Sequence, residues 1–366
     1  MANIEDQIRE IEEEIRDTPY NKSTQHHIGR LKAKLAKLQD ELDKRRAKKG
    51  EAKGYAVKKS GHATVALVGL PSVGKSTLLN VLTDAESEVA SYYFTTLKVV
   101  PGVMQYNGAK IQILDLPGLV EGASKGKGRG KEVISVARSA DLILLMIDVF
   151  NCELNLLVKE LGKGGIRLNQ SPPDVIVTKK DRGGVVINST VDLTKLDKET
   201  IAAIFREYGH VNADIVIRED ITEDRLIDAI AKNRIYTPGI IVLNKIDLVS
   251  KEDINAIKKT LGDVPISGIS AKEGKGLDEL RKEIYNKLDF IRIFMKPQRQ
   301  KTDYEEPLVI RKHSTVGDVC DIIHRTFKKR FRYANIWGES AKFPGQTVGM
   351  RHVLHEGDVL TIVVSK

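Results

Sequence analysis

One short segment of the chain has the residue types and spacing of a phosphate-binding loop. Residues 69–76 read Gly-Leu-Pro-Ser-Val-Gly-Lys-Ser, which matches the pattern G-x-x-x-x-G-K-[ST]. The glycines allow backbone N–H groups to curl around phosphate oxygens, and a helix that starts there adds positive potential. We expect Lys75 to reach the β- and γ-phosphates and the Ser76 hydroxyl to bind Mg²⁺. The positions expected to contact nucleotide are Gly69, Ser72, Val73, Gly74, Lys75, Ser76 and Thr77.

A second motif supplies a carboxylate and a glycine for the same phosphates. The run Asp115-Leu-Pro-Gly118 follows the apolar run 111–114. A carboxylate at the end of a strand can hold Mg²⁺ through its second shell, and Gly118 can offer a backbone N–H to the γ-phosphate. Alone, such a D-x-x-G run is usually a turn. Its place between the other motifs favours the phosphate role.

Two motifs further along the chain have the residue types for recognising a guanine base. Asp247, in the run Asn244-Lys245-Ile246-Asp247, can accept hydrogen bonds from guanine N1–H and the exocyclic amine. Adenine has no donors there and would leave the carboxylate unpaired, which disfavours an ATPase. The run Ser270-Ala271-Lys272 follows the next apolar stretch and can close over the base.

The elements that must position these motifs are visible as a change of pattern at about residue 62. Short apolar runs then alternate with helical stretches, which predicts an α/β fold with a doubly wound, mostly parallel sheet. Residues 151–236 interrupt the alternation with short strands and two helices, near 198–208 and 223–232, and predict an inserted α+β domain. The sheet domain is therefore expected in two stretches, 60–150 and 237–290.

The two flanks have patterns of their own. Residues 1–50 carry isoleucines and then leucines at helical spacing on either side of Thr18-Pro19, which predicts a helical hairpin. Residues 291–366 read as short strands around one helix at about 316–331.

Charge is distributed unevenly over these parts. The total of +9 divides into −4 over residues 1–29, +8 over 30–59, −1 over 60–289 and +6 over 290–366. The basic flanks are either solvated surfaces or contacts for a polyanion such as RNA. The chain has two cysteines, an acidic start without an apolar signal segment, and no apolar run long enough to cross a bilayer. We therefore expect a cytoplasmic protein that does not bind membranes.

The motifs resemble those of the translation-factor class of P-loop GTPases. The runs Tyr92-Tyr-Phe-Thr-Thr-Leu97 and Asp115-Leu-Pro-Gly-Leu-Val-Glu-Gly-Ala123 resemble the Obg branch, and nearly the whole chain resembles the developmentally regulated GTP-binding protein family of archaea and eukaryotes. The resemblance implies that Thr96, or alternatively Thr95, is the switch threonine that contacts Mg²⁺ and the attacking water. It also implies that the insert is similar to a ribosomal protein domain and that residues 291–366 form a TGS domain, a β-grasp module.

Position 119 bears on the rate of hydrolysis. Many small GTPases place a glutamine there to orient water, whereas this chain has Leu119, which we expect to pack under the switch. We therefore expect slow intrinsic hydrolysis that needs a cation or a partner. Related GTPases use K⁺ with an asparagine where this chain has Ser72, so K⁺ activation stays open. The Gly- and Lys-rich run 122–131 is either a solvated loop or a switch that orders on GTP or RNA.

These predictions converge on a monomeric GTPase with GTP or GDP and Mg²⁺ as ligands. Its expected role is a switch on a ribosome- or RNA-associated step of translation, with a helper protein as a further partner. The alternative is a nucleotide-dependent RNA- or ribosome-binding scaffold whose hydrolysis is incidental.

Overall fold

The computed structural model describes residues 4–48, 59–83, 92–93, 98–120, 122–123, 130–262, 265–297 and 301–365. The chain divides into two compact units. One comprises Met1–Tyr55 and Gly165–Tyr236, and the other comprises Ala56–Gly164 and Thr237–Lys366. Thr95, Thr96 and most of the Gly- and Lys-rich run lie outside the described residues. Among the helices of the described ranges, none combines the length and apolar character needed to cross a bilayer.

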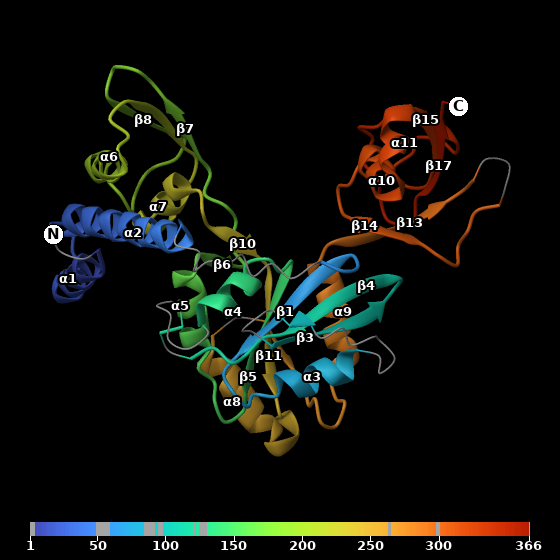
Figure 1. The fold of residues 1–366 in the computed structure, drawn as a ribbon, viewed down its shortest axis with the longest axis horizontal. Helices are drawn as coiled ribbons and strands as arrows, with labels where there is room; N and C mark the ends of the chain where they lie inside the picture. Colours follow the sequence, from blue (N-terminus) through green and yellow to red (C-terminus); the bar gives the residue numbers. More distant parts are fainter. Residues whose placement is uncertain are drawn as a thin grey trace. The chain divides into compact units, whose positions relative to one another are not determined.

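The larger unit is built on a seven-stranded sheet in the order β12-β11-β5-β1-β4-β3-β2. Strands β11, β5, β1, β4 and β3 of this sheet are labelled in Figure 1. Every residue of β1, β5 and β11 is buried, so both faces of the sheet centre are covered, as expected for parallel strands. The strands are β1 Ala63–Gly69, β2 Tyr92–Tyr93, β3 Lys98–Tyr106, β4 Ala109–Asp115, β5 Leu142–Asp148, β11 Gly239–Asn244 and β12 Ile266–Gly268. The helices are α3 Lys75–Leu82, α4 Gly130–Ala137, α5 Leu154–Lys163, α8 Lys251–Thr260 and α9 Leu277–Lys287, with a short 3₁₀ turn η1 at Ile246–Leu248.

The pairing of the strands brings the predicted motifs to one edge. Strand β1 pairs in parallel with β4 and β5, and β11 pairs in parallel with β5 and β12. The carboxyl ends of parallel strands meet at the same edge of a sheet, and ligands bind there. Gly69, Asp115 and Asn244 are the last residues of β1, β4 and β11, so the sheet delivers the three motifs together. Among the described strands of this sheet, β3 pairs antiparallel with β4 on one side and with β2 on the other.

The C-terminal module has a five-stranded sheet in the order β14-β13-β17-β15-β16. Its strands are β13 Phe290–Met295, β14 Leu308–Arg311, β15 Phe331–Trp337, β16 Gln346–Val348 and β17 Val359–Val364. The helix expected at 316–331 is instead two helices, α10 Val316–Ile323 and α11 Arg325–Arg330. His324 between them has an extended backbone, and its ring accepts a hydrogen bond from the Thr326 N–H at the start of α11.

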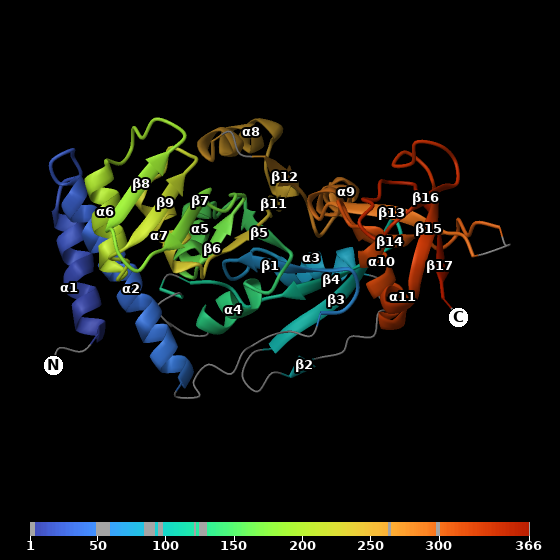
Figure 2. The same ribbon diagram turned by 90° about the horizontal axis from the view of Figure 1, so that it is seen from above.

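The smaller unit combines the N-terminal hairpin with the insert (Figure 2). Its helices are α1 Ile4–Asp17, α2 Gln25–Lys48, α6 Lys198–Glu207 and α7 Glu223–Ala231. Its strands are β6 Ile166–Leu168, β7 Val175–Lys179, β8 Val185–Ser189, β9 Ala213–Ile217 and β10 Ile235–Thr237. Strands β7, β9 and β8 form one sheet, and β6 pairs with β10.

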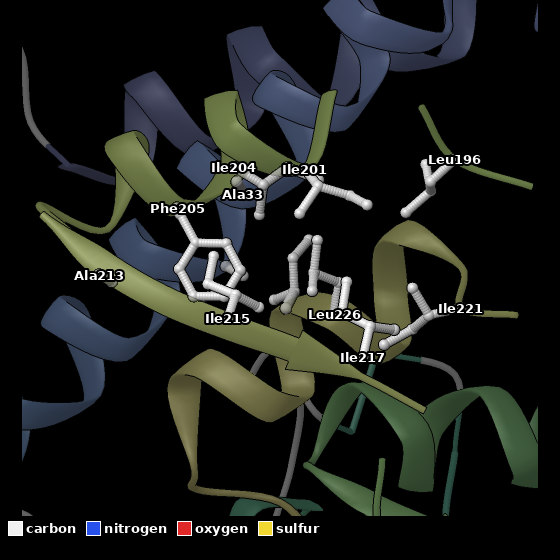
Figure 3. Close-up of a cluster of buried hydrophobic side chains, with 12 residues drawn as sticks. Ala33, Leu196, Ile201, Ile204, Phe205, Ala213, Ile215, Ile217, Ile221 and Leu226 are labelled. Carbon is white, nitrogen blue, oxygen red and sulfur yellow. The ribbon is translucent and has the colours of Figure 1, made fainter. Parts of the chain in front are cut away.

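One hydrophobic core holds that unit together. Ala33 of α2 is buried in the same cluster as Phe205 of α6 and Ile215 of β9 (Figure 3). Ala36 of α2 belongs to this cluster as well. The hairpin therefore completes the core of the insert, although we expected the two as separate domains at 1–50 and 151–236. The first residues of the stretch 151–236, which we expected to form the insert, belong to the larger unit and include helix α5, because the division falls between residues 164 and 165.

Candidate functional site

The loop between β1 and α3 has a left-handed backbone conformation at Ser72 and at Gly74. Gly74 has φ 95° and stands immediately before α3, while Ser72 has φ 64°. Both values lie in the left-handed region, which favours glycine and is uncommon for serine. A Cβ on Gly74 would approach the Asn244 side-chain nitrogen to 2.3 Å, so the loop and β11 pack without room for a side chain.

Lys75 lies at the first turn of α3 and is 7% exposed. Its Nζ donates to the carbonyl of Leu70 at 2.8 Å and to that of Gly69 at 3.3 Å, so the ammonium lies within the loop. Burial lowers the pKa of Lys75, and the charge of Asp115 opposes that shift. A buried cation enclosed by loop carbonyls is placed to meet phosphate oxygens, which are stronger acceptors.

Ser76 and Asp115 supply the side-chain oxygens that could bind a metal ion in the site. The Ser76 hydroxyl donates to Asp115 Oδ2 at 2.5 Å, joining the start of α3 to the end of β4. Burial raises the pKa of Asp115, while the hydrogen bond from Ser76 and the charge of Lys75 act in the opposite direction. A hydroxyl and a carboxylate are hard oxygen donors of the kind that Mg²⁺ prefers when phosphates supply further ligands. The residues present therefore fit the expected ion.

The segment after β4 packs directly against the phosphate loop. A Cβ on Gly118 would approach the backbone nitrogen of Pro71 to 2.6 Å, so this glycine permits close contact between the two segments. The Leu119 N–H donates to the Gly69 carbonyl at 3.0 Å. The Leu119 side chain is 1% exposed, so it is buried, while the switch threonine under which we expected it to pack lies outside the described residues.

Asn244 joins the phosphate loop to the last predicted motif. Its side-chain nitrogen donates to the Val73 carbonyl at 2.9 Å, and its Oδ1 accepts from the Ala271 N–H at 3.0 Å. Asn244, Val73 and Ala271 are all buried. One amide side chain thus fixes the spacing between the loops expected to hold the phosphates and the base.

Lys245 forms a second connection to the phosphate loop. Its Nζ donates to the Ser72 carbonyl at 3.0 Å and lies 2.5 Å from Oδ2 of Asp148, the last residue of β5. The Nζ also lies 6.0 Å from the centre of the Phe150 ring, which is 70% exposed. The sequence interpretation missed Asp148 and Phe150. The available signal was a carboxylate at the end of an apolar run, the same signal that identified Asp115.

Asp247 lies in η1, where a carboxylate can face the base. A hydrogen bond from Ser270 lowers the pKa of Asp247, and the charges of Lys272 and Lys275 act in the same direction. Ser270 is buried, and its hydroxyl also accepts from the Glu273 N–H at 3.2 Å. The Asp247 carboxylate is therefore held ionised, the form that accepts from guanine.

The remaining predicted residues differ in how they are placed. Thr77 and Lys272 are exposed, and among the described residues the interaction seen with another motif is the charge of Lys272 on Asp247. Thr96 lies outside the described residues, so its expected role on Mg²⁺ stays a prediction.

Comparison with family models divides the chain into three successive matches. A model described as "50S ribosome-binding GTPase" matches residues 64–180, and one described as "C-terminal region of MMR_HSR1 domain" matches residues 182–290. A TGS domain model matches residues 291–364. The first match contains the phosphate loop and the second contains Asn244 to Lys272.

Relatives similar over the full chain come from archaea and eukaryotes. An uncharacterised GTP-binding protein of Methanocaldococcus jannaschii is 56% identical, covering 100% of this chain and 94% of the relative. Developmentally-regulated GTP-binding protein 1 of Xenopus laevis is 47% identical, covering 99% of this chain and 100% of the relative. Developmentally-regulated GTP-binding protein 2 of Homo sapiens is 44% identical, covering 98% of this chain and 99% of the relative.

Proposed function

Because the chain belongs to the developmentally regulated GTP-binding protein family, we propose that it hydrolyses GTP slowly and that this cycle switches a ribosome- or RNA-associated step of translation in the cytoplasm. The observation that carries the proposal is the convergence of Lys75, Ser76 and Asp115 with the Asn244-to-Asp247 turn at one sheet edge. This convergence supports a single site for phosphate chemistry and guanine selection.

The phosphate half of the site acts by placing charge and hydrogen-bond donors. The left-handed backbone at Gly74 exposes N–H groups at the start of α3, and Lys75 contributes a buried cation. Ser76 and Asp115 would hold Mg²⁺, which neutralises phosphate charge when bound. Gly118, held against Pro71, would present its N–H to the γ-phosphate. Thr96 would complete this half of the site, as the family resemblance implies.

Slow turnover follows from the side chain at position 119. A buried leucine has no donor or acceptor with which to orient the attacking water. The protein therefore depends on backbone donors, a cation or a partner. If K⁺ binds beside Ser72, turnover should be faster in KCl than in NaCl at the same ionic strength. Equal rates in the two salts would remove K⁺ from the mechanism.

The basic flanks support a partner that carries phosphate. Exposed cations lie on α2 at Arg30, Lys34 and Lys37, and on the C-terminal module at Lys328, Lys329, Arg330 and Arg332. Such cations neutralise nucleic-acid phosphates and make binding dependent on salt. The family that matches residues 64–180 is described as a 50S ribosome-binding GTPase, which favours the ribosome as the RNA-bearing partner.

The buried Leu119 also favours a second candidate, a nucleotide-dependent scaffold on the ribosome or on RNA whose hydrolysis is incidental. One experiment separates the two. Ribosomes are co-sedimented with the protein bound to GDP or to a non-hydrolysable GTP analogue, and GTP turnover is measured with and without ribosomes. A cycling switch should bind better with the analogue and hydrolyse faster on ribosomes. A scaffold should show the same binding difference without stimulation, and no ribosome or RNA binding in either state would refute both.

A further inference from the structure

The site contains a buried carboxylate to which neither the sequence motifs nor the family comparisons assign a role. Asp148 is 5% exposed and ends β5, and it pairs in register with Asn244 at the end of β11. Burying a carboxylate is costly unless it is paired and hydrogen-bonded. Asp148 meets both conditions, and its two carboxylate oxygens contact different groups.

The first oxygen orders the backbone that follows β5. Asp148 Oδ1 accepts from the N–H of Phe150 at 3.0 Å and from the N–H of Asn151 at 2.8 Å. The same segment is closed by backbone hydrogen bonds between Asp148 and Asn151 in both directions. This turn also carries the exposed Phe150 ring near Lys245.

The second oxygen fixes the lysine of the guanine motif. Asp148 Oδ2 and the Ser72 carbonyl both contact Lys245 Nζ, at 2.5 and 3.0 Å. The backbone of Lys245 has φ 64°, a left-handed conformation that persists where surrounding contacts determine it. Lys245 therefore spans from the phosphate loop to the turn that bears Asp247, and Asp148 holds it in that extended position.

We propose that Asp148 is a positioning residue for nucleotide binding, which acts by fixing Lys245 before the nucleotide arrives. The inference rests on the proposed nucleotide site. A lysine side chain loses much rotational freedom when it is ordered, and prior ordering removes that cost from binding. Loss of the carboxylate should therefore weaken nucleotide affinity about tenfold. Base selectivity should not change, because Asp247 carries it.

The test compares full-length variants by titration with GDP and with IDP, which lacks the exocyclic amine. Asp148→Asn should weaken binding of both nucleotides about tenfold at an unchanged GDP-to-IDP ratio. In a Lys245→Met background the same change should have almost no further effect. Asp228→Asn is the matched control: Asp228 is also 5% exposed and is paired with Arg167 and Arg234 in the other compact unit. It should leave both affinities unchanged.

Three results would overturn the inference: affinity of Asp148→Asn within about twofold of wild type, an equal loss in the Lys245→Met background, or a changed GDP-to-IDP ratio. If the asparagine variant does not fold, Asp148→Glu is tested instead, because it keeps the charge and displaces it by one methylene. Unchanged nucleotide affinity of Asp148→Glu would also overturn the inference. Failure of the wild type to bind GDP would instead refute the proposed function.

Discussion

Asn244 offers a direct test of how the site is held together. Its side chain makes two buried hydrogen bonds, to the Val73 carbonyl at 2.9 Å and from the Ala271 N–H at 3.0 Å. Replacing it with alanine removes both and leaves two buried backbone groups without their partner. At roughly 1–1.5 kcal/mol for each bond, the loss is about 2–3 kcal/mol of local stability.

Hydrogen exchange measures this loss where it occurs. Asn244→Ala should speed amide exchange in residues 72–76 and 270–273 about 30- to 150-fold, because 1.4 kcal/mol corresponds to tenfold. GDP affinity should fall along with the exchange protection. Asn255, exposed on α8, provides the matched control as Asn255→Ala. Unchanged exchange in both loops would show that Asn244 does not join them, and our account of the site would be wrong. Faster exchange across the entire chain would indicate global unfolding instead.

Three further predictions concern individual roles. Lys75→Ala should weaken GDP and GTP binding at least about tenfold, since it removes a charged donor from the phosphates. The control Lys251→Ala on α8 should leave both affinities unchanged. If titration gives Lys75→Ala the same affinities as wild type, the assignment is contradicted. Asp247→Asn should reduce GDP affinity about tenfold or more and leave ADP binding weak, and a retained preference for GDP over ADP by the same factor as wild type would refute the base assignment. Burial raises the pKa of Asp115 above its ordinary 3.8, so the folded protein binds that proton more tightly than the unfolded chain. The contribution of Asp115 to the free energy of unfolding without nucleotide should therefore fall as pH rises from 3.8 through the raised value. Carboxylates with a lowered pKa, such as Asp247, contribute in the opposite direction, so the fall is measured as the difference between wild type and Asp115→Asn. Asp115→Asn should lack this pH-dependent loss of stability, so it should melt at a higher temperature than wild type at pH 7. The variant should also bind GDP more weakly in the presence of Mg²⁺. A lower melting temperature would show that the ionised carboxylate stabilises the fold.

The motifs were predictable because their chemistry is local in sequence and their position follows from strand ends. Gly69, Asp115 and Asn244 each follow or end an apolar run, and parallel pairing places such ends at one edge. Burial of Leu119 could be anticipated in the same way. Thr96 lies outside the described residues, so no comparison with the structure applies to it.

Features that depend on contacts distant in sequence were not predictable. The pair formed by Asp148 and Lys245 joins residues 97 positions apart through the register of β5 and β11. Ala33 and Ala36 look like ordinary helix residues, and only the insert shows why they are small and apolar. The break at His324 was hidden because apolar spacing continues through it, while a ring-to-backbone cap determines the geometry.

The nested connectivity of the two units has a consequence for how the protein is made. Synthesis proceeds from the N-terminus, and domains generally fold as their residues emerge. The apolar face of α2 is complete early, but α6 and β9, which bury it, emerge more than 100 residues later. Strand β11, which ends at Asn244, and the following Asp247 emerge later still, after the insert. A nascent chain that ends near residue 230 would therefore carry the phosphate loop without the guanine-selecting residues.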